Sequence, residues 1–328
     1  MVKITRRRAL ATALLAAPAL LAPRAQAQTP AQSWPHRPVR FIIPFGPGAG
    51  ADIGARLIQE KLSARWGKPV VIDNRPGGDS IIAIQAMLSA NDDHTFLWGP
   101  SGNFIVHPYL YQKLSYNPDD LLPIASFSAT VLSVGVPTSL GVSDLADFVK
   151  RARAEAGKLN SAAVPGITEL AFDYFAVTAG LTFTKVPYRD IVQAVNDLAE
   201  GRLQVYSSSY AIQRPQREAG RIKVLAQMGR KRAPSLPDIP TSAEVGFPAL
   251  EMEGLVGLFG SPAVSAELRE KIGADIVAVA DDKDLDAKLN ATAQTPTRGG
   301  AKEFAEIMAR QRAQIATITK ALDLKPTR

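Results

Sequence analysis

The residues best suited to chemistry in this sequence form a glycine-rich run, PFGPGAGAD, at positions 44–52. Glycines ahead of a helix let the backbone bend and bring amide N–H groups close to an anion, and the helix N-terminus adds its dipole. Such a segment binds a carboxylate or phosphate without a cationic side chain. An ordinary strand–helix turn that merely prefers glycine is the simpler interpretation of the same letters.

A dinucleotide site is a rival interpretation of this run. Asp73 ends the next predicted strand, at about the position where an acid would contact a ribose. However, the spacing of Gly46, Gly48 and Gly50 is not G-x-G-x-x-G, and Pro47 removes an amide that a pyrophosphate would use. The pattern therefore favours a small anion over a nicotinamide cofactor.

Signals of catalysis are weak elsewhere in the chain. The serine run 207–209 lacks the G-x-S-x-G nucleophile elbow, and the sequence has no cysteine. Of its three histidines, His94 is expected to be solvated in a polar turn, and His107 precedes a proline in an expected loop with a structural role. We therefore predict no enzyme, no cofactor and no metal. An exported hydrolase that uses Ser208 is the alternative.

Strands and helices alternate along the chain, which predicts parallel sheets covered on both faces. A strand at 39–44 leads through the glycine turn to a helix for which Asp52 is a suitable N-cap. The other expected helices lie at 79–90, 143–156, 167–179, 190–200, 265–280 and 301–321, and further strands at 70–73, 95–98, 131–136, 159–164, 183–187, 203–206 and 222–227. Positions 230–248 contain four prolines and predict a long loop.

The basic charge of the chain is concentrated at its start. The net charge is +7, of which Lys3, Arg6, Arg7, Arg8 and Arg24 supply +5 with no acid before position 28. The near-neutral remainder gives no electrostatic footprint for nucleic acid.

The same leader resembles a signal peptide. A basic start precedes the apolar run 9–22, and Ala25-Gln26-Ala27 predicts cleavage after Ala27 and export to the periplasm. Residues 5–10 also resemble the twin-arginine motif. A membrane anchor is the alternative, but 14 residues fall short of the roughly 20 that span a bilayer.

Several motifs together carry a resemblance to a known family. They include the stretch from Trp34 to Asp52, the segment PVVIDNRPG at 69–77, GKLN at 157–160, VPY at 186–188, and the proline-rich segment 234–241. In this order, over nearly all of the predicted mature chain, they resemble the substrate-binding receptors of tripartite tricarboxylate transporters (the Bug family).

This resemblance implies an α/β fold, a two-domain periplasmic binding protein of type II-like architecture. Each domain would be a mainly parallel sheet flanked by helices, with two chain crossings as the hinge. Residues 1–27 would be the signal peptide, 28–128 plus 253–328 domain 1, and 129–252 domain 2. The protein would be a monomeric receptor that captures a mono- or dicarboxylate in the interdomain cleft, aromatic acids included, and delivers it to membrane permease subunits. A ligand-sensing receptor for a signalling kinase is an alternative with the same binding chemistry.

The family's pattern also assigns binding residues. The first turn would contribute Phe45, Gly46, Pro47, Gly48, Gly50, Ala51 and Asp52, and the second domain Pro165, Gly166, Thr168, Tyr188, Arg189, Asp190 and Ser208. The segment 161–169 is more apolar than the family's usual serines and glycines, which favours a ligand with an apolar or aromatic body. Asp190 could instead cap its helix, and Glu169 could favour an amine.

Overall fold

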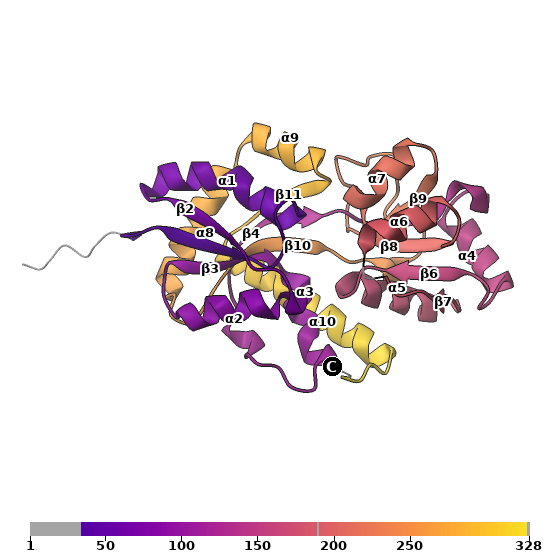
Figure 1. Cartoon of the computed structure of the whole chain (residues 1–328), viewed down its shortest axis with the longest axis horizontal. Coiled ribbons are helices and arrows are strands. Elements are labelled where there is room, and N and C mark those ends of the chain that lie inside the picture. Colours follow the sequence, from indigo (N-terminus) through magenta and orange to yellow (C-terminus); the bar gives the residue numbers. More distant parts are fainter. Residues whose placement is uncertain (1–33, 189, 327–328) are drawn as a thin grey trace, which may run out of the picture. The chain divides into compact units, whose positions relative to one another are not determined.

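Two β-sheets organise the described residues, 34–188 and 190–326, of the computed structural model (Figure 1). The predicted signal peptide, its cleavage point and Arg189 lie outside the described residues. The six-stranded sheet has the order β11-β4-β10-β3-β1-β2, and the five-stranded sheet β7-β6-β8-β5-β9. The strands of the first are β1 (Val39–Ile43), β2 (Val70–Asn74), β3 (Thr95–Pro100), β4 (Leu122–Thr130), β10 (Gly254–Gly260) and β11 (Gln294–Gly299). Those of the second are β5 (Leu132–Pro137), β6 (Asn160–Ala163), β7 (Thr184–Lys185), β8 (Val205–Ser209) and β9 (Ile222–Gln227).

Helices flank both sheets, which confirms the α/β class with two sheets. The first lobe, defined here as the six-stranded sheet and its helices, contains α1 (Gly50–Trp66), α2 (Ile81–Ala90), α3 (Ser101–Leu110), α8 (Ala266–Ala280) and α9 (Lys283–Ala291). The second lobe, the five-stranded sheet and its helices, contains α4 (Leu145–Ala154), α5 (Ile167–Thr178), α6 (Ile191–Ala199) and α7 (Tyr210–Glu218). Helix α10 (Ala301–Ala321) packs on β4 of the first lobe and on α5 of the second.

The strand directions correct one prediction, because the sheets are mixed rather than mainly parallel. In the first lobe β1 is parallel to β2 and β3, but β10 is antiparallel to β3 and β4, and β11 to β4. In the second, β6 is parallel to β7 and β8, while β5 is antiparallel to β8 and β9. Strand–helix–strand units produce the parallel pairs. The antiparallel pairs involve β5 and β10, the strands that enter each sheet from the other lobe, together with the edge strand β11.

The chain passes between the sheets twice. Strand β4 ends at Thr130 and β5 begins at Leu132, so the first passage is at Val131. The second is the segment 228–253 between β9 and β10, where the Met252 amide donates to the Met228 carbonyl oxygen at 2.7 Å. No helix in the described residues is long and apolar enough to cross a bilayer.

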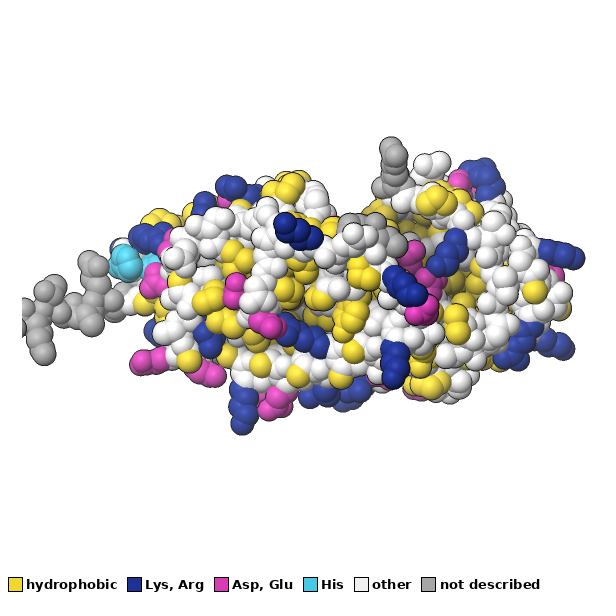
Figure 2. Space-filling view, turned by 90° about the horizontal axis from the view of Figure 1, so that it is seen from below, with side chains coloured by type: hydrophobic (Ala, Val, Ile, Leu, Met, Phe, Trp, Pro, Cys, Tyr) yellow, Lys and Arg dark blue, Asp and Glu magenta, His cyan; other side chains and the backbone are white. Residues whose placement is uncertain are grey.

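Aromatic packing supports the elements that carry the glycine turn. The apolar strand β1 is buried, and its Phe41 ring stacks on Trp98 of β3 at 5.4 Å between centroids. Phe127 of β4 also packs against Trp98, with 5.0 Å between the ring centroids. On the face of the molecule drawn in Figure 2, basic and acidic side chains are interspersed rather than gathered into one basic patch.

Candidate functional site

The glycine run forms a tight turn between β1 and α1. The Ala49 amide donates to the Gly46 carbonyl oxygen at 3.3 Å, and Gly48 adopts φ +86°, a left-handed conformation that glycine reaches without a side-chain clash. Gly46 and Gly48 have open space where a Cβ would stand. The turn therefore needs glycine at position 48 for its backbone angles and not for lack of room.

Asp52 has a role that differs from the predicted one. The N-cap of α1 is Ala49, and Asp52 lies within the first turn of the helix, 1% exposed. Its Oδ2 accepts hydrogen bonds from the Gly48 amide and Arg56 Nε, both at 2.9 Å, and its Oδ1 accepts from Asn74 Nδ2 at 2.9 Å. Burial alone would raise the pKa of Asp52, but the bonds from Arg56, Gly48 and Asn74 lower it below its usual value.

The buried carboxylate therefore reaches back to hold the loop rather than to cap the helix. Asn74 extends this support, because its Nδ2 also donates to the Phe45 carbonyl oxygen at 2.9 Å. One amide predicted for the ligand, that of Gly48, is occupied by Asp52.

Other amides of the turn point to an anion site. The N–H groups of Gly46, Gly50, Ala51 and Asp52 have no hydrogen-bond acceptor among the described residues. The first amides of a helix lack intrahelical partners and carry the positive end of its dipole. The arrangement can bind a carboxylate oxygen through neighbouring backbone amides.

Two residues that sequence reasoning missed hold this first turn from within the lobe. Trp98 Nε1 donates to the Ala51 carbonyl oxygen at 3.0 Å, and Gln294 Nε2 donates to the Gly50 carbonyl oxygen at 3.0 Å. Both side chains are buried, at 0% and 1% exposed. No sequence motif marks Gln294, which is 244 positions from Gly50.

The second-lobe turn between β6 and α5 has comparable geometry. Gly166 precedes α5 with φ +100°, and its carbonyl oxygen accepts from the Leu170 amide. The amides of Ile167 and Thr168 have no acceptor among the described residues, and Thr168 is 5% exposed. The α5 turn is thus a second set of amides able to meet an anion.

The α5 turn also touches the first lobe directly. A Cβ on Gly102, in the first turn of α3, would lie 2.6 Å from the Ile167 side chain. Glycine at position 102 therefore lets the first turns of α3 and α5 meet.

The remaining predicted residues play varied parts. Tyr188 donates its hydroxyl to Asp197 Oδ2 at 2.6 Å, and burial together with this bond raises the pKa of Tyr188 to about 12. Asp190 caps α6, because its side chain accepts from the Val192 amide, which confirms the capping alternative.

Ser208 is fully buried, and its hydroxyl accepts from Gln213 Nε2 at 2.8 Å and donates to the Ser209 carbonyl oxygen. Its bonds therefore lie within its own lobe and not to a histidine.

A cavity of about 430 Å³ adjoins the α5 turn. Apolar walls come from Pro165, Phe172 and Pro187, and polar groups include Tyr188 and the ion pair of Lys185 with Asp173. Pro165 and Tyr188, which were both predicted to bind the ligand, line this cavity together. The cavity offers an apolar surface next to the start of α5, and its lining also includes the acidic Glu169.

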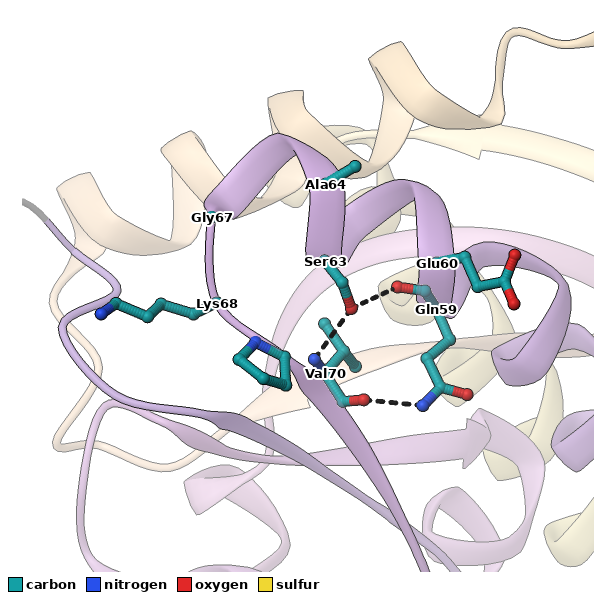
Figure 3. A pocket seen from close by; sticks show the side chains of 8 residues that line it. Gln59, Glu60, Ser63, Ala64, Gly67, Lys68 and Val70 are labelled. Carbon is teal, nitrogen blue, oxygen red and sulfur yellow. Dashed lines mark hydrogen bonds between the residues drawn. The ribbon is translucent and has the colours of Figure 1, made fainter.

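Another cavity, of about 600 Å³, lies at the opposite end of α1 (Figure 3). There Ser63 Oγ donates to the Gln59 carbonyl oxygen and accepts from the Val70 amide, while Gln59 Nε2 donates to the Val70 carbonyl oxygen. These polar groups form hydrogen bonds with one another, and the bonds of Ser63 and Gln59 with Val70 connect α1 to β2. We interpret this cavity as structural.

The histidines correct two further predictions. His94 is fully buried rather than solvated; its Nδ1 lies 2.6 Å from Asp93 Oδ1, and its Nε2 accepts from the His36 amide. His107 lies inside helix α3 rather than in a loop, buried, with Nδ1 2.6 Å from the Tyr116 hydroxyl. Their contacts agree with structural roles.

Comparison with known proteins gives consistent matches. The family model described as "Tripartite tricarboxylate transporter family receptor" matches residues 54–324. A UPF0065 protein from the tcbD-tcbE intergenic region of Pseudomonas sp. strain P51 is 34% identical over 250 residues, 74% of each chain. Protein BugT of Bordetella pertussis is 28% identical over 223 residues, 66% of this chain and 68% of BugT.

Solved structures agree with these matches. R. palustris Rpa4515 with adipate superimposes with a TM-score of 0.77 at 28% identity, covering 90% of this chain and 100% of that one. The periplasmic binding protein BugD, at 22% identity, shows the same fold with a TM-score of 0.73, covering 90% of this chain and 100% of BugD.

Proposed function

Since this chain belongs to the tripartite tricarboxylate transporter receptor family, whose members are solute-binding receptors rather than enzymes, we propose that it captures a small organic acid and delivers it to membrane permease subunits. The observation that carries the proposal is the set of unpartnered amides at Gly50, Ala51 and Asp52, oriented by Trp98 and Gln294. A charge-assisted hydrogen bond from such an amide contributes about 1.5–3 kcal/mol.

We further propose that the carboxylate is shared between the first turns of α1 and α5. The free amides of Ile167 and Thr168 support this, as does the contact of α5 with α3. The hinge would follow the two passages at Val131 and 228–253, with domain 2 at 129–252. The cavity beside Pro165 supports a ligand with an apolar body. Adipate, bound to Rpa4515, is a suitable first probe.

The test is isothermal titration of the purified protein with a panel of mono- and dicarboxylates that includes adipate and benzoate. Adipamide, which has the length of adipate but no charge, is the matched control. We expect a carboxylate to bind and adipamide to bind at least 100-fold more weakly, equivalent to about 2.7 kcal/mol. A protein that binds neutral or cationic solutes and none of the acids would contradict the proposal.

We also propose that the leader, residues 1–27, directs export and is removed. N-terminal sequencing of the protein recovered from the periplasmic fraction should begin at Gln28. A protein found only in the cytoplasm with Met1 retained would refute this.

A further inference from the structure

The short turn between α9 and β11, residues 291–294, contacts three separate parts of the molecule. Arg214 Nη1 of α7, in the second lobe, donates to the Ala291 carbonyl oxygen at 2.7 Å. The amide of Val131, at the first passage between the sheets, donates to the Ala293 carbonyl oxygen at 3.1 Å. Gln294 then reaches the first turn of α1 through Gly50. One segment therefore links the second lobe, the passage between the sheets and the anion-binding turn.

Ala293 fixes this turn in an unusual conformation. Its φ of +55° is left-handed, a region that residues with a Cβ rarely occupy. The residue is fully buried in a hydrophobic cluster with Val131, Tyr210 and Leu236, from the passage and the second lobe. Strain of this kind persists where the surroundings over-determine it, and it is concentrated at switching and binding segments. The packing thus holds the first-lobe turn against the second lobe.

Gln294 makes the link to α1 rigid. Its Nε2 donates to the Gly50 carbonyl oxygen and to Thr292 Oγ1 at 3.2 Å, and its Oε1 accepts from Ser128 Oγ at 2.8 Å. A Cβ on Gly50 would lie 3.7 Å from this amide, so the side chain is packed closely under the helix. Its bonds leave little freedom to move without the first turn of α1.

From these contacts we propose that Gln294 is a positioning residue for the anion-binding turn, and that the turn 291–294 makes this position depend on the second lobe through Arg214. The inference rests on the proposed function. Movement of α7 away from Ala291 would break the hydrogen bond from Arg214 and leave the turn 291–294 free to move. Gln294 would then hold the Gly50 carbonyl oxygen less firmly. Because coupling between sites is reciprocal, carboxylate binding at α1 would in turn favour the contact of Arg214 with Ala291.

Hydrogen exchange of the unliganded protein tests the coupling without a ligand. The reporter is the peptide covering 46–58, which includes the Ile53 amide bonded to the Ala49 carbonyl oxygen. We expect Arg214→Met and Gln294→Met each to raise exchange there several-fold, and Arg214→Lys to restore it because lysine can still donate to Ala291. The control is Arg221→Met, since the exposed Arg221 side chain has no hydrogen bond or ion pair among the described residues. Unchanged exchange in Arg214→Met would overturn the inference.

Titration with adipate gives the second readout. We expect the Kd to rise about three- to tenfold in Arg214→Met and Gln294→Met and to stay unchanged in Arg221→Met, in keeping with the loss of one hydrogen bond. An equal Kd in wild type and Arg214→Met would also overturn the inference. If the wild-type protein binds no carboxylate, the proposed function fails, whereas the exchange result still decides whether the coupling exists.

Discussion

Replacing Asp52 by Asn tests whether the buried carboxylate holds the glycine turn. Asparagine keeps the size of the side chain but has only one acceptor oxygen, and its NH2 group would face donors. Wild-type Asp52 accepts from Gly48, Asn74 and Arg56. Losing the charge and leaving a buried donor unsatisfied costs about 2–3 kcal/mol, within the range measured for hydrogen bonds to charged groups. Urea unfolding monitored by circular dichroism measures this loss.

Arg56→Met is the matched control, because it removes the ion pair but leaves both amide donors their acceptor. The Arg56 side chain is 49% exposed, so solvent screens the pair, and we expect a loss below about 1 kcal/mol. Adipate affinity should also fall more in Asp52→Asn than in Arg56→Met, since only the former releases the turn. Equal losses of unfolding free energy in the two variants would mean that the ion pair with Arg56 alone explains the contribution of Asp52 to stability.

The pH dependence gives an independent check. The pKa of Asp52 is lowered in the folded protein, so its stabilisation is present above the unfolded pKa near 3.8 and is lost as the pH falls through the folded pKa. The stability difference between wild type and Asp52→Asn should therefore shrink as the pH is lowered below about 4. A difference that stays constant to pH 2 would refute the assignment.

Two further predictions concern the turn and a buried histidine. Gly48→Ala should cost about 1–2 kcal/mol from its left-handed backbone and weaken adipate binding, whereas Gly46→Ala, with open space and no positive φ, should be near neutral in urea unfolding. Equal effects would show that backbone angle at position 48 does not matter. Burial lowers the pKa of His94 below its usual 6.5, although the neighbouring Asp93 acts in the opposite direction. The contribution of His94 to the free energy of unfolding is therefore complete above pH 6.5 and is lost as the pH falls through the folded pKa. His94→Gln should remove this part of the pH dependence of unfolding, and an unaltered profile would contradict it.

Local sequence predicts the elements that carry strong periodic signals. Strand β1, the glycine turn and the body of α1 follow from an apolar run, turn residues and helical spacing, all within 28 residues of one another. The closing helix at 301–321 is confirmed residue for residue. Helix α3 was missed because Pro108, a helix breaker in most contexts, lies inside it. Strand β11 was missed because QTPTRG is polar and contains a proline, which is tolerated at a sheet edge.

The sequence by itself determined three features of this protein: a glycine run ahead of a helix, the motifs of a receptor family, and the absence of cysteine. Tertiary structure alone decided which amides are free. Asp52 takes the Gly48 amide, while Trp98 and Gln294 hold the carbonyls of α1 from β3 and β11. The reason is physical, because backbone propensities act between neighbours in the chain, whereas a buried hydrogen bond is specified only once folding brings its partners together.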